Sequence, residues 1–306
     1  MRINTDKFIN KQKPITFTVS KEMTLFAFLA EQMPKKNRHN IKTLLGSKQV
    51  VVDGKFITKY DYMLKAGQEV SLLTERIERE KSYRGISILY EDHYIIVIDK
   101  HAGILSIATN TQKDHTAFSM LSNHVKKQNP ENKIFIVHRL DRDTSGVMIF
   151  AKSEDIKNTL QKSWDKNILD KTYIAVVEGC VNKEAGTIES YLKEGHSLKV
   201  YSSQNPKDGL KAITHYTVLK KTPYYSLLKI TIDTGRKNQI RVHMQDIGHS
   251  IVGDKKYGAK INPIKRLALH AQRLSFIHPV SGEVMTFETN IPRKFSRLFE
   301  PDEHPL

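Results

Sequence analysis

Cysteine is almost absent from this sequence: Cys180 is the one cysteine among 306 residues. A single thiol cannot form a disulfide within the chain, and it excludes a metal centre built from several thiolates. No apolar run approaches the roughly 20 residues that a membrane-spanning helix needs. The N-terminal segment lacks the apolar core of a secretory signal peptide. We therefore expect a cytoplasmic protein with no membrane partner.

Acidic residues are few relative to basic ones. The chain has 33 aspartates and glutamates against 49 lysines and arginines, which gives a formal net charge of +16 and a pI of about 9.6. This charge favours a polyanionic partner, because basic side chains release counterions from phosphates on binding. An acidic membrane surface is the weaker alternative, since the lysines are not gathered on one amphipathic helix.

Residues 1–73 have the pattern of a small α+β domain. Thr24 can cap a first helix that carries apolar residues at helical spacing. Asn37 can cap a second helix, and Gly46 fits the left-handed position after its end. An Asp-Gly turn within residues 50–57 predicts a β-hairpin.

This combination of two helices and a hairpin resembles the small RNA-binding fold known as the S-four-like or α-L domain. Such a domain would bind RNA phosphates by charge rather than by reading bases. The alternative is an ordinary solvated helix face. The predicted basic face consists of Lys35, Lys36, Arg38, His39, Lys42 and Lys48.

The charged, aperiodic residues 74–84 predict a linker, and residues 85–306 a second, larger domain. Long runs of strands with few helices are typical of an α+β domain around a mixed, mostly antiparallel sheet. Helices are predicted at 115–127, 154–166 and 239–247. Strands are predicted at 86–91, 94–100, 133–138, 146–152, 171–179, 212–221, 225–234, 273–278 and 283–289.

Two polar segments stand out in this domain. HRLDRDTSG (138–146) separates two short apolar runs, and DTGRKNQIRVH (233–243) follows another strand and leads into a helix. A salt-bridged hairpin tip is the alternative for the first segment. Such a tip needs Gly or Asn at fixed places, rather than two arginines and two aspartates. Two such clusters in one domain predict opposite walls of one cleft.

Five segments can be compared with known families, and along the chain they occur in the order HRLDRDTSG, KTYIAVVEG, TGRKNQIRVHM, GHSIVGDKKYG and LHAQRLSFIHPVSG. Together they resemble the RluA-type family of RNA pseudouridine synthases, over residues 86–290. The resemblance implies the pseudouridine synthase fold for the larger domain. The sequence departs from the family pattern at His101, where proline is usual, and at Asn238, where histidine is usual.

The resemblance implies an isomerase that breaks the N1–C1′ bond of a uridine, turns the base and joins C5 to C1′. Nothing is oxidised and no phosphoryl group moves, so no cofactor and no metal are expected. Asp141 would act at the ribose, either as a nucleophile or as a base. Arg241 would keep Asp141 ionised in a pocket poor in water. Tyr173 would stack on the uracil and assist proton transfer at C5.

The same resemblance suggests how RNA is held. The target base has to leave its stack, at a cost of about a few kcal/mol. Arg139 would occupy the vacated space or hold the flipped nucleotide. Arg142 and Arg236 would bind flanking phosphates, or be purely structural. The other polar residues of the two segments are expected to be structural: His138, Asp143, Thr144, Ser145 and His243.

The RNA itself is not named by these motifs. The basic N-terminal module favours large-subunit ribosomal RNA as the substrate, and transfer RNA is the alternative. We expect a monomeric enzyme and no protein partner. A non-catalytic RNA-binding or ribosome assembly factor would not need the predicted catalytic set. A magnesium-dependent nuclease using Asp141, Asp143 and Glu154 is disfavoured, because Arg139 and Arg142 straddle the two aspartates.

Overall fold

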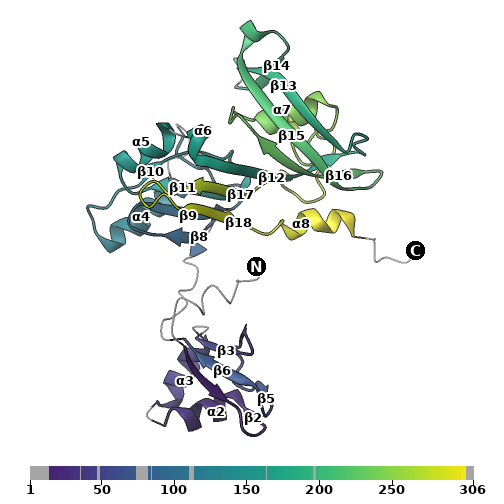
Figure 1. Ribbon diagram of the computed structural model, residues 1–306. Coiled ribbons are helices and arrows are strands. Elements are labelled where there is room, and N and C mark those ends of the chain that lie inside the picture. Colours follow the sequence, from purple (N-terminus) through teal and green to yellow (C-terminus); the bar gives the residue numbers. More distant parts are fainter. Residues whose placement is uncertain are drawn as a thin grey trace. The chain divides into compact units, whose positions relative to one another are not determined.

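The structure is a computed structural model, shown in Figure 1. It divides into two compact units, Met1–Lys81 and Ser82–Leu306. Within the described part, no helix is both long and apolar enough to cross a membrane. Of the predicted linker 74–84, residues 82–83 are described, and they pair with the next strand. The described residues are 14–34, 36–46, 49–73, 82–83, 85–109, 114–162, 164–195 and 198–300.

The helices of the first unit begin where their capping residues predict. Thr24 accepts the backbone N–H of Ala27 (3.3 Å) at the start of α2 (Leu25–Gln32). Asn37 accepts the N–H of Asn40 (2.9 Å) at the start of α3 (Arg38–Gly46). Both predicted caps are confirmed.

The prediction of a left-handed Gly46 is wrong. Gly46 is the last residue of α3 and has no positive φ. The chain leaves the helix without a left-handed residue there, because the N–H of Gln49 closes the helix end on the carbonyl of Leu44 (3.1 Å).

The first unit has a four-stranded antiparallel sheet. Its order is β1 (Ile15–Thr18), β6 (Glu69–Leu72), β3 (Val50–Val52) and β4 (Lys55–Phe56), while β2 (Met23–Thr24) pairs with β5 (Met63–Leu64). Asp53 and Gly54, between β3 and β4, have φ of 45° and 75°. Positive φ at both positions is the type I′ turn that an Asp-Gly pair favours, so the predicted hairpin is confirmed.

The second unit is organised around one twelve-stranded sheet. Its order is β14-β13-β15-β16-β12-β17-β11-β9-β8-β7, with β10 beside β11 and β18 beside β17. The described pairings are antiparallel except that of β11 with β17. The predicted mixed, mostly antiparallel sheet is confirmed. The strands are β7 (Ser82–Tyr83), β8 (Ile86–Glu91), β9 (Ile95–Lys100), β10 (Phe135–Ile136), β11 (Ser145–Ala151), β12 (Ile168–Glu178), β13 (Ala185–Glu194), β14 (Val200–Ser203), β15 (Leu210–Lys221), β16 (Tyr225–Ile232), β17 (Leu269–Ile277) and β18 (Val284–Glu288).

Helices pack against both ends of this sheet, which we call its wings: one with β7, β8 and β9, the other with β13, β14 and β15 (Figure 1). The helix α4 (Ala117–Gln128) buries Leu121 and Val125 against β8, β9 and β11. On the other wing, α7 (Gln239–Asp246) packs against β14 and β15. Residues of the predicted helix 154–166 form α5 (Glu154–Lys162) and α6 (Trp164–Asn167), and Ser163 lies outside the described residues. The remaining short helices are η1 (Pro206–Asp208), η2 (Lys255–Tyr257), α8 (Arg293–Ser296) and η3 (Arg297–Phe299).

Two features of the sheet differ from the sequence prediction. The strand predicted at 133–138 is reduced to the two residues of β10, because the chain then turns into the polar segment 138–146. Strands β13 and β14 were not predicted at all. The residues of β13 are mostly solvent-facing, so they do not form the apolar run that marks a buried strand.

The polar segment 138–146 ends where two strands approach closely. Gly146 has φ of 122°, and a Cβ there would lie 2.0 Å from the carbonyl oxygen of Ala271 in β17. No side chain fits between these backbones. Glycine therefore permits the parallel contact of β11 with β17, which anchors the end of the segment to the centre of the sheet.

Candidate active site

The two polar segments meet at one cleft of about 90 Å³. Its walls come from the loop before β11 and from the start of α7, and residues of β12, β16 and β17 also line it. The predicted pair of opposite walls is confirmed. The polar residues on these walls include Arg139, Asp141, Tyr173, Arg236, Asn238 and Arg241.

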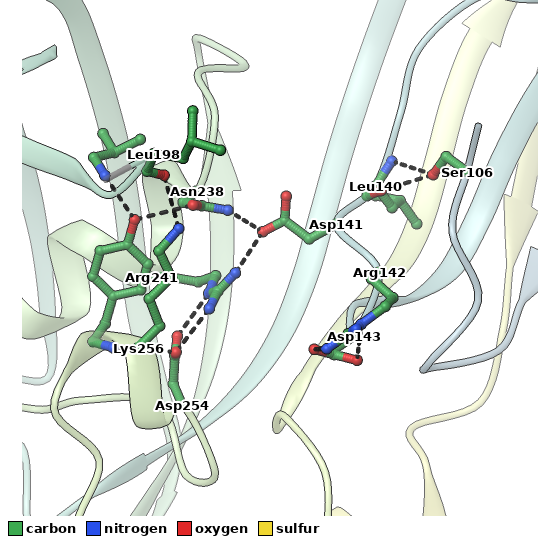
Figure 2. A network of polar contacts seen from close by, with 12 residues as sticks. Ser106, Leu140, Asp141, Arg142, Asp143, Leu198, Asn238, Arg241, Asp254 and Lys256 are labelled. Atoms are coloured by element: carbon green, nitrogen blue, oxygen red, sulfur yellow. Dashed lines mark hydrogen bonds and ion pairs between the residues drawn. The ribbon is translucent and has the colours of Figure 1, made fainter. Parts of the chain in front are cut away.

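Asp141 is held through one of its two carboxylate oxygens (Figure 2). Nη1 of Arg241 donates to Oδ2 at 3.0 Å, and Nδ2 of Asn238 donates to the same atom at 2.5 Å. Within the described part of the chain, no group donates to Oδ1. The side chain is 26% exposed, so this second oxygen is accessible from the cleft.

Arg241 is itself fixed by a nearly inaccessible partner. Nε and Nη2 donate to the two carboxylate oxygens of Asp254 at 2.7 and 2.8 Å. The guanidinium also lies over the ring of Tyr257, 4.9 Å from its centroid. Burial lowers the pKa of Arg241, but hydrogen bonding and attraction to Asp254, with help from Asp141, outweigh burial and raise the pKa above its usual range. Arg241 is a permanent cation beside Asp141.

Asn238 contacts Asp141, although the sequence analysis assigned it no role. It precedes α7 with φ 54° and ψ 18°, in the left-handed region. Its amide oxygen accepts the hydroxyl of Tyr257 at 3.0 Å, while its amide nitrogen donates to Asp141. The departure from the family's histidine was the available signal for this position.

Tyr173 lies on β12, directly after a register shift between Thr172 and Tyr173 in the pairing with β17. Such bulges redirect side chains beside active sites. Burial, and then the charge of Asp141, raise the pKa of Tyr173 to about 12. The hydroxyl therefore keeps its proton at neutral pH, and it makes no hydrogen bond within the described part of the chain.

The predicted RNA-binding arginines occupy different positions. Arg139 and Arg236 are exposed and line the cleft, and Nε of Arg236 donates to the carbonyl of Lys211 (3.1 Å). Arg142 does not line the cleft. It forms an ion pair with Asp143 at 3.2 Å, so Asp143 contacts an arginine outside the cleft.

The basic face of the first unit is partly described. Lys36, Arg38 and Lys42 are all exposed. The guanidinium of Arg38 lies 5.6 Å from the ring centroid of Phe26, and the ammonium of Lys42 lies 5.8 Å from that of Tyr60. The predicted Lys35 and Lys48, and the side chain of His39, lie outside the described residues.

A buried lysine that no sequence pattern revealed lies behind the loop that carries Asp141. Lys100 has no exposed surface, and its ammonium donates to the carbonyls of His101 (3.1 Å), Ile104 (2.7 Å) and Arg142 (3.0 Å). Burial lowers the pKa of Lys100 to about 7, against the opposing charges of Asp143 and Asp141. Its position at the end of an apolar strand was the only signal. Lys100 ties the loop that carries Asp141 to the end of β9.

The two predicted structural histidines have protein partners. His138 accepts the N–H of Ile149 (3.1 Å), and His243 is hydrogen-bonded to Ser190 and Thr214. Burial lowers the pKa of both to about 4, with Lys171 contributing at His138. In the described part of the chain, no cluster of three histidines, cysteines or carboxylates has the arrangement of a metal site.

Fold and site together define a class of enzyme. A large mixed sheet carries a cleft with an accessible carboxylate, a permanent cation and a protonated phenol, in a chain of strongly basic charge. Such a set suits chemistry at a carbon centre of a polyanionic substrate.

Comparison with known proteins names the class. Residues 93–246 match the family of RNA pseudouridylate synthases. The chain is 32% identical over 295 residues to an uncharacterized RNA pseudouridine synthase of Aquifex aeolicus, covering 91% of this chain and 93% of that one. It is 31% identical over 307 residues to ribosomal large subunit pseudouridine synthase D of Escherichia coli O157:H7, covering 94% and 93%.

Solved structures agree on the fold. The human protein RNA pseudouridylate synthase domain containing 4 matches with a TM-score of 0.57 at 23% identity, covering 68% of this chain and 90% of that one. The chain therefore belongs to the RNA pseudouridine synthase family, whose members are isomerases that act on uridine in RNA. The resemblance detected in the motifs is confirmed.

Proposed function

We propose that this enzyme isomerises uridines of large-subunit ribosomal RNA, with Asp141 as the catalytic carboxylate. The observation that carries the proposal is the accessible Oδ1 of Asp141, in a cleft where Oδ2 is fixed by Arg241 and Asn238. All three residues lie inside the segment that matches the family. The similarity to a ribosomal large subunit pseudouridine synthase supports ribosomal RNA over transfer RNA.

The chemistry assigns Asp141 one of two roles. As a nucleophile, Oδ1 would attack C1′ of the ribose as the N1–C1′ bond breaks. As a base, it would remove a proton from the sugar. In the first route C5 then displaces the Asp141 oxygen from C1′, and in the second the sugar regains its proton from Asp141 as C5 bonds to C1′. In either route the proton at C5 leaves and N1 gains one, so the reaction needs no oxidant. Arg241 places a permanent positive charge beside the Asp141 carboxylate that both routes use.

Tyr173 supplies the aromatic surface of the proposed site. Its ring lines the cleft and can stack on the uracil. Because the hydroxyl keeps its proton at neutral pH, Tyr173 can donate a hydrogen bond or relay a proton during rearrangement at C5.

Binding of the RNA uses exposed cations of both units. Arg139, at the cleft, would hold the flipped nucleotide or fill its place in the stack, and Arg236 would bind a phosphate at the opposite wall. Arg142 would contact a phosphate further along. The first unit would act as an S-four-like RNA-binding domain within residues 1–73, through Lys35, Lys36, Arg38 and Lys42. We propose that the enzyme acts as a monomer, without a protein partner.

The test is a map of pseudouridine in total RNA from a strain that lacks the gene and from its parent. In the strain that lacks the gene, we expect one or more pseudouridines to be missing from large-subunit ribosomal RNA. The wild-type gene should restore them, and a gene that encodes Asp141→Asn should not. Missing positions confined to transfer RNA would refute the ribosomal assignment while leaving the cleft assignment intact.

A further inference from the structure

A chain of hydrogen bonds runs through the protein and ends on Asp141 (Figure 2). The backbone N–H of Val200, in β14, donates to the hydroxyl oxygen of Tyr257 (3.1 Å). The Tyr257 hydroxyl donates to Oδ1 of Asn238 (3.0 Å), and Nδ2 of Asn238 donates to Oδ2 of Asp141 (2.5 Å). Tyr257 has no exposed surface, so water does not compete for its hydroxyl.

The direction of this chain is fixed at both ends. A backbone N–H can only donate, so the Tyr257 hydroxyl accepts from Val200 and has its single proton left for Asn238. An ionised carboxylate can only accept. The amide of Asn238 is therefore held with its oxygen towards Tyr257 and its nitrogen towards Asp141. A reversed amide would set its oxygen against the Asp141 carboxylate, one acceptor facing another, and would remove the acceptor of the Tyr257 proton.

The position of Asn238 before α7 also shows that its side chain is not used to cap the helix. Asparagine is favoured before a helix because its side chain accepts an N–H of the first turn. Asn238 occupies that position before α7, yet its side chain makes no capping hydrogen bond. Its left-handed backbone, with φ 54° and ψ 18°, is one that asparagine adopts more readily than most residues.

We propose that Asn238 is a positioning residue that fixes the rotation of the Asp141 carboxylate. A single donor, Arg241, would leave the carboxylate free to turn about its contact, whereas two donors on Oδ2 define its plane and leave Oδ1 for the ribose. Asn238 supplies this constraint without adding charge, and Tyr257 holds the amide in the required orientation. The inference rests on the proposed function, since it assumes that Asp141 reacts with the substrate.

The substitution Asn238→Asp tests the donor directly, because it keeps the shape and replaces the amide N–H groups by a second carboxylate. Two carboxylates at hydrogen-bond distance share one proton, and loss of that proton is shifted to higher pH. With the proton, Asn238→Asp can still donate to Asp141. Without it, the two charges repel and the Asp141 carboxylate is displaced.

The charges around position 238 determine the pH at which the two carboxylates lose the proton that they share. Cations lower the pH at which it leaves, and neighbouring carboxylates raise it. The charged and titratable side chains around this position come from several elements: Asp141 from the loop before β11, Lys100 from β9, Tyr173 from β12, Glu194 from β13, Lys237 from the loop before α7, Arg241 from α7, and Asp254, Lys256 and Tyr257 from η2 and its cap.

The assay measures tritium release from total RNA of the gene-deleted strain, labelled at C5 of uridine, between about pH 6 and about pH 9. For Asn238→Asp we expect kcat to fall at least about tenfold from the acid to the alkaline end, where the wild type changes little. Asn238→Ala should lose about 10-fold to 100-fold in kcat at every pH, with KM unchanged. Tyr257→Phe should lose about fivefold, the effect of one neutral hydrogen bond.

Asn129→Asp is the matched control, because Asn129 is an exposed residue whose side chain oxygen accepts the N–H of Glu131. It should behave as the wild type at every pH. The inference is overturned if Asn238→Asp keeps the wild-type pH profile, or if the loss in Asn238→Asp is independent of pH and follows a lowered melting temperature. An active Asp141→Asn in the same assay would instead refute the proposed function, so the two failures are distinguishable.

Discussion

The positive charges of the two units are arranged in opposite ways. In the candidate active-site cleft, Arg241 is 13% exposed and has two carboxylate partners, one of them nearly inaccessible. On the first unit, Lys36, Arg38 and Lys42 are exposed, and within the described residues none of them forms an ion pair. The cleft fixes the charge of Arg241, whereas the first unit presents these three charges to solvent.

This difference separates two tasks that a basic protein performs on RNA. A cation held by a buried carboxylate cannot follow a phosphate, but it keeps neighbouring groups in place for chemistry. An unpaired, exposed cation contributes little to the fold and gains affinity by releasing counterions. Changes in the cleft should therefore alter kcat, and changes on the first unit should alter RNA affinity and its salt dependence.

Asp141→Asn should produce the largest effect. The amide has the shape of the carboxylate but neither its charge nor its nucleophilicity, so turnover should fall by at least about 10⁴-fold, or about 5 kcal/mol of transition-state stabilisation. RNA affinity should hold or rise, because a negative charge near phosphates is removed. Tritium release from C5-labelled uridine gives the rate, and filter binding gives the affinity.

Asp143→Asn is the control for this prediction, because Asp143 pairs with Arg142 outside the cleft. It should reduce the rate far less. A folded Asp141→Asn variant that keeps more than about a tenth of the wild-type rate would remove Asp141 from the chemistry.

Tyr173→Phe should give the next largest effect. The substitution keeps the ring and removes a hydroxyl whose raised pKa keeps it protonated at neutral pH. Loss of a group that assists proton transfer costs about 10²-fold or more in rate, while stacking and RNA affinity should be preserved. Tyr224→Phe, at an exposed tyrosine, is the matched control. Equal rates for the two variants would reduce Tyr173 to a stacking surface.

The cleft was predictable where its residues are neighbours in the sequence or belong to recognisable segments. The two cleft walls follow from two short polar runs beside apolar strands, and the choice of Asp141 and Arg241 within them follows from the resemblance to the family. The catalytic roles drawn from them are still predictions. The large sheet was predictable because strands such as β11 are continuous apolar runs.

What could not be predicted depends on contacts between distant residues. Asn238 and Tyr257 are 19 residues apart, and Tyr257 and Val200 are 57 apart, so no local pattern reveals their hydrogen bonds. Lys100 was missed because lysine is normally exposed, and three carbonyl partners become visible only in the folded chain. The strand β13 was missed because its polar residues face solvent on an open wing.

Replacing Lys36, Arg38 and Lys42 by alanine should leave kcat unchanged and weaken RNA binding. Each phosphate that the protein no longer neutralises removes about 0.7 to 0.9 from the log–log slope of affinity against salt, so the triple variant should lower the slope by about 2. Lys21→Ala is the control, since Lys21 lies 3.9 Å from Glu31. A triple variant with the wild-type slope would show that this face does not touch RNA. The exposed cations of the first unit would then have no part in RNA binding.

Excess EDTA should have the smallest effect, within about twofold in the rate at saturating RNA. The positive charge beside Asp141 comes from Arg241, and the N–H groups of Arg241 and Asn238 already point at Oδ2, where a metal ion would have to displace them. Spermidine and monovalent salt should keep the RNA folded, and its melting curve checks this. If magnesium alone restores activity to RNA that is folded without it, a divalent cation takes part in the cleft. Arg241 would then not be the sole source of the positive charge that the reaction needs beside Asp141.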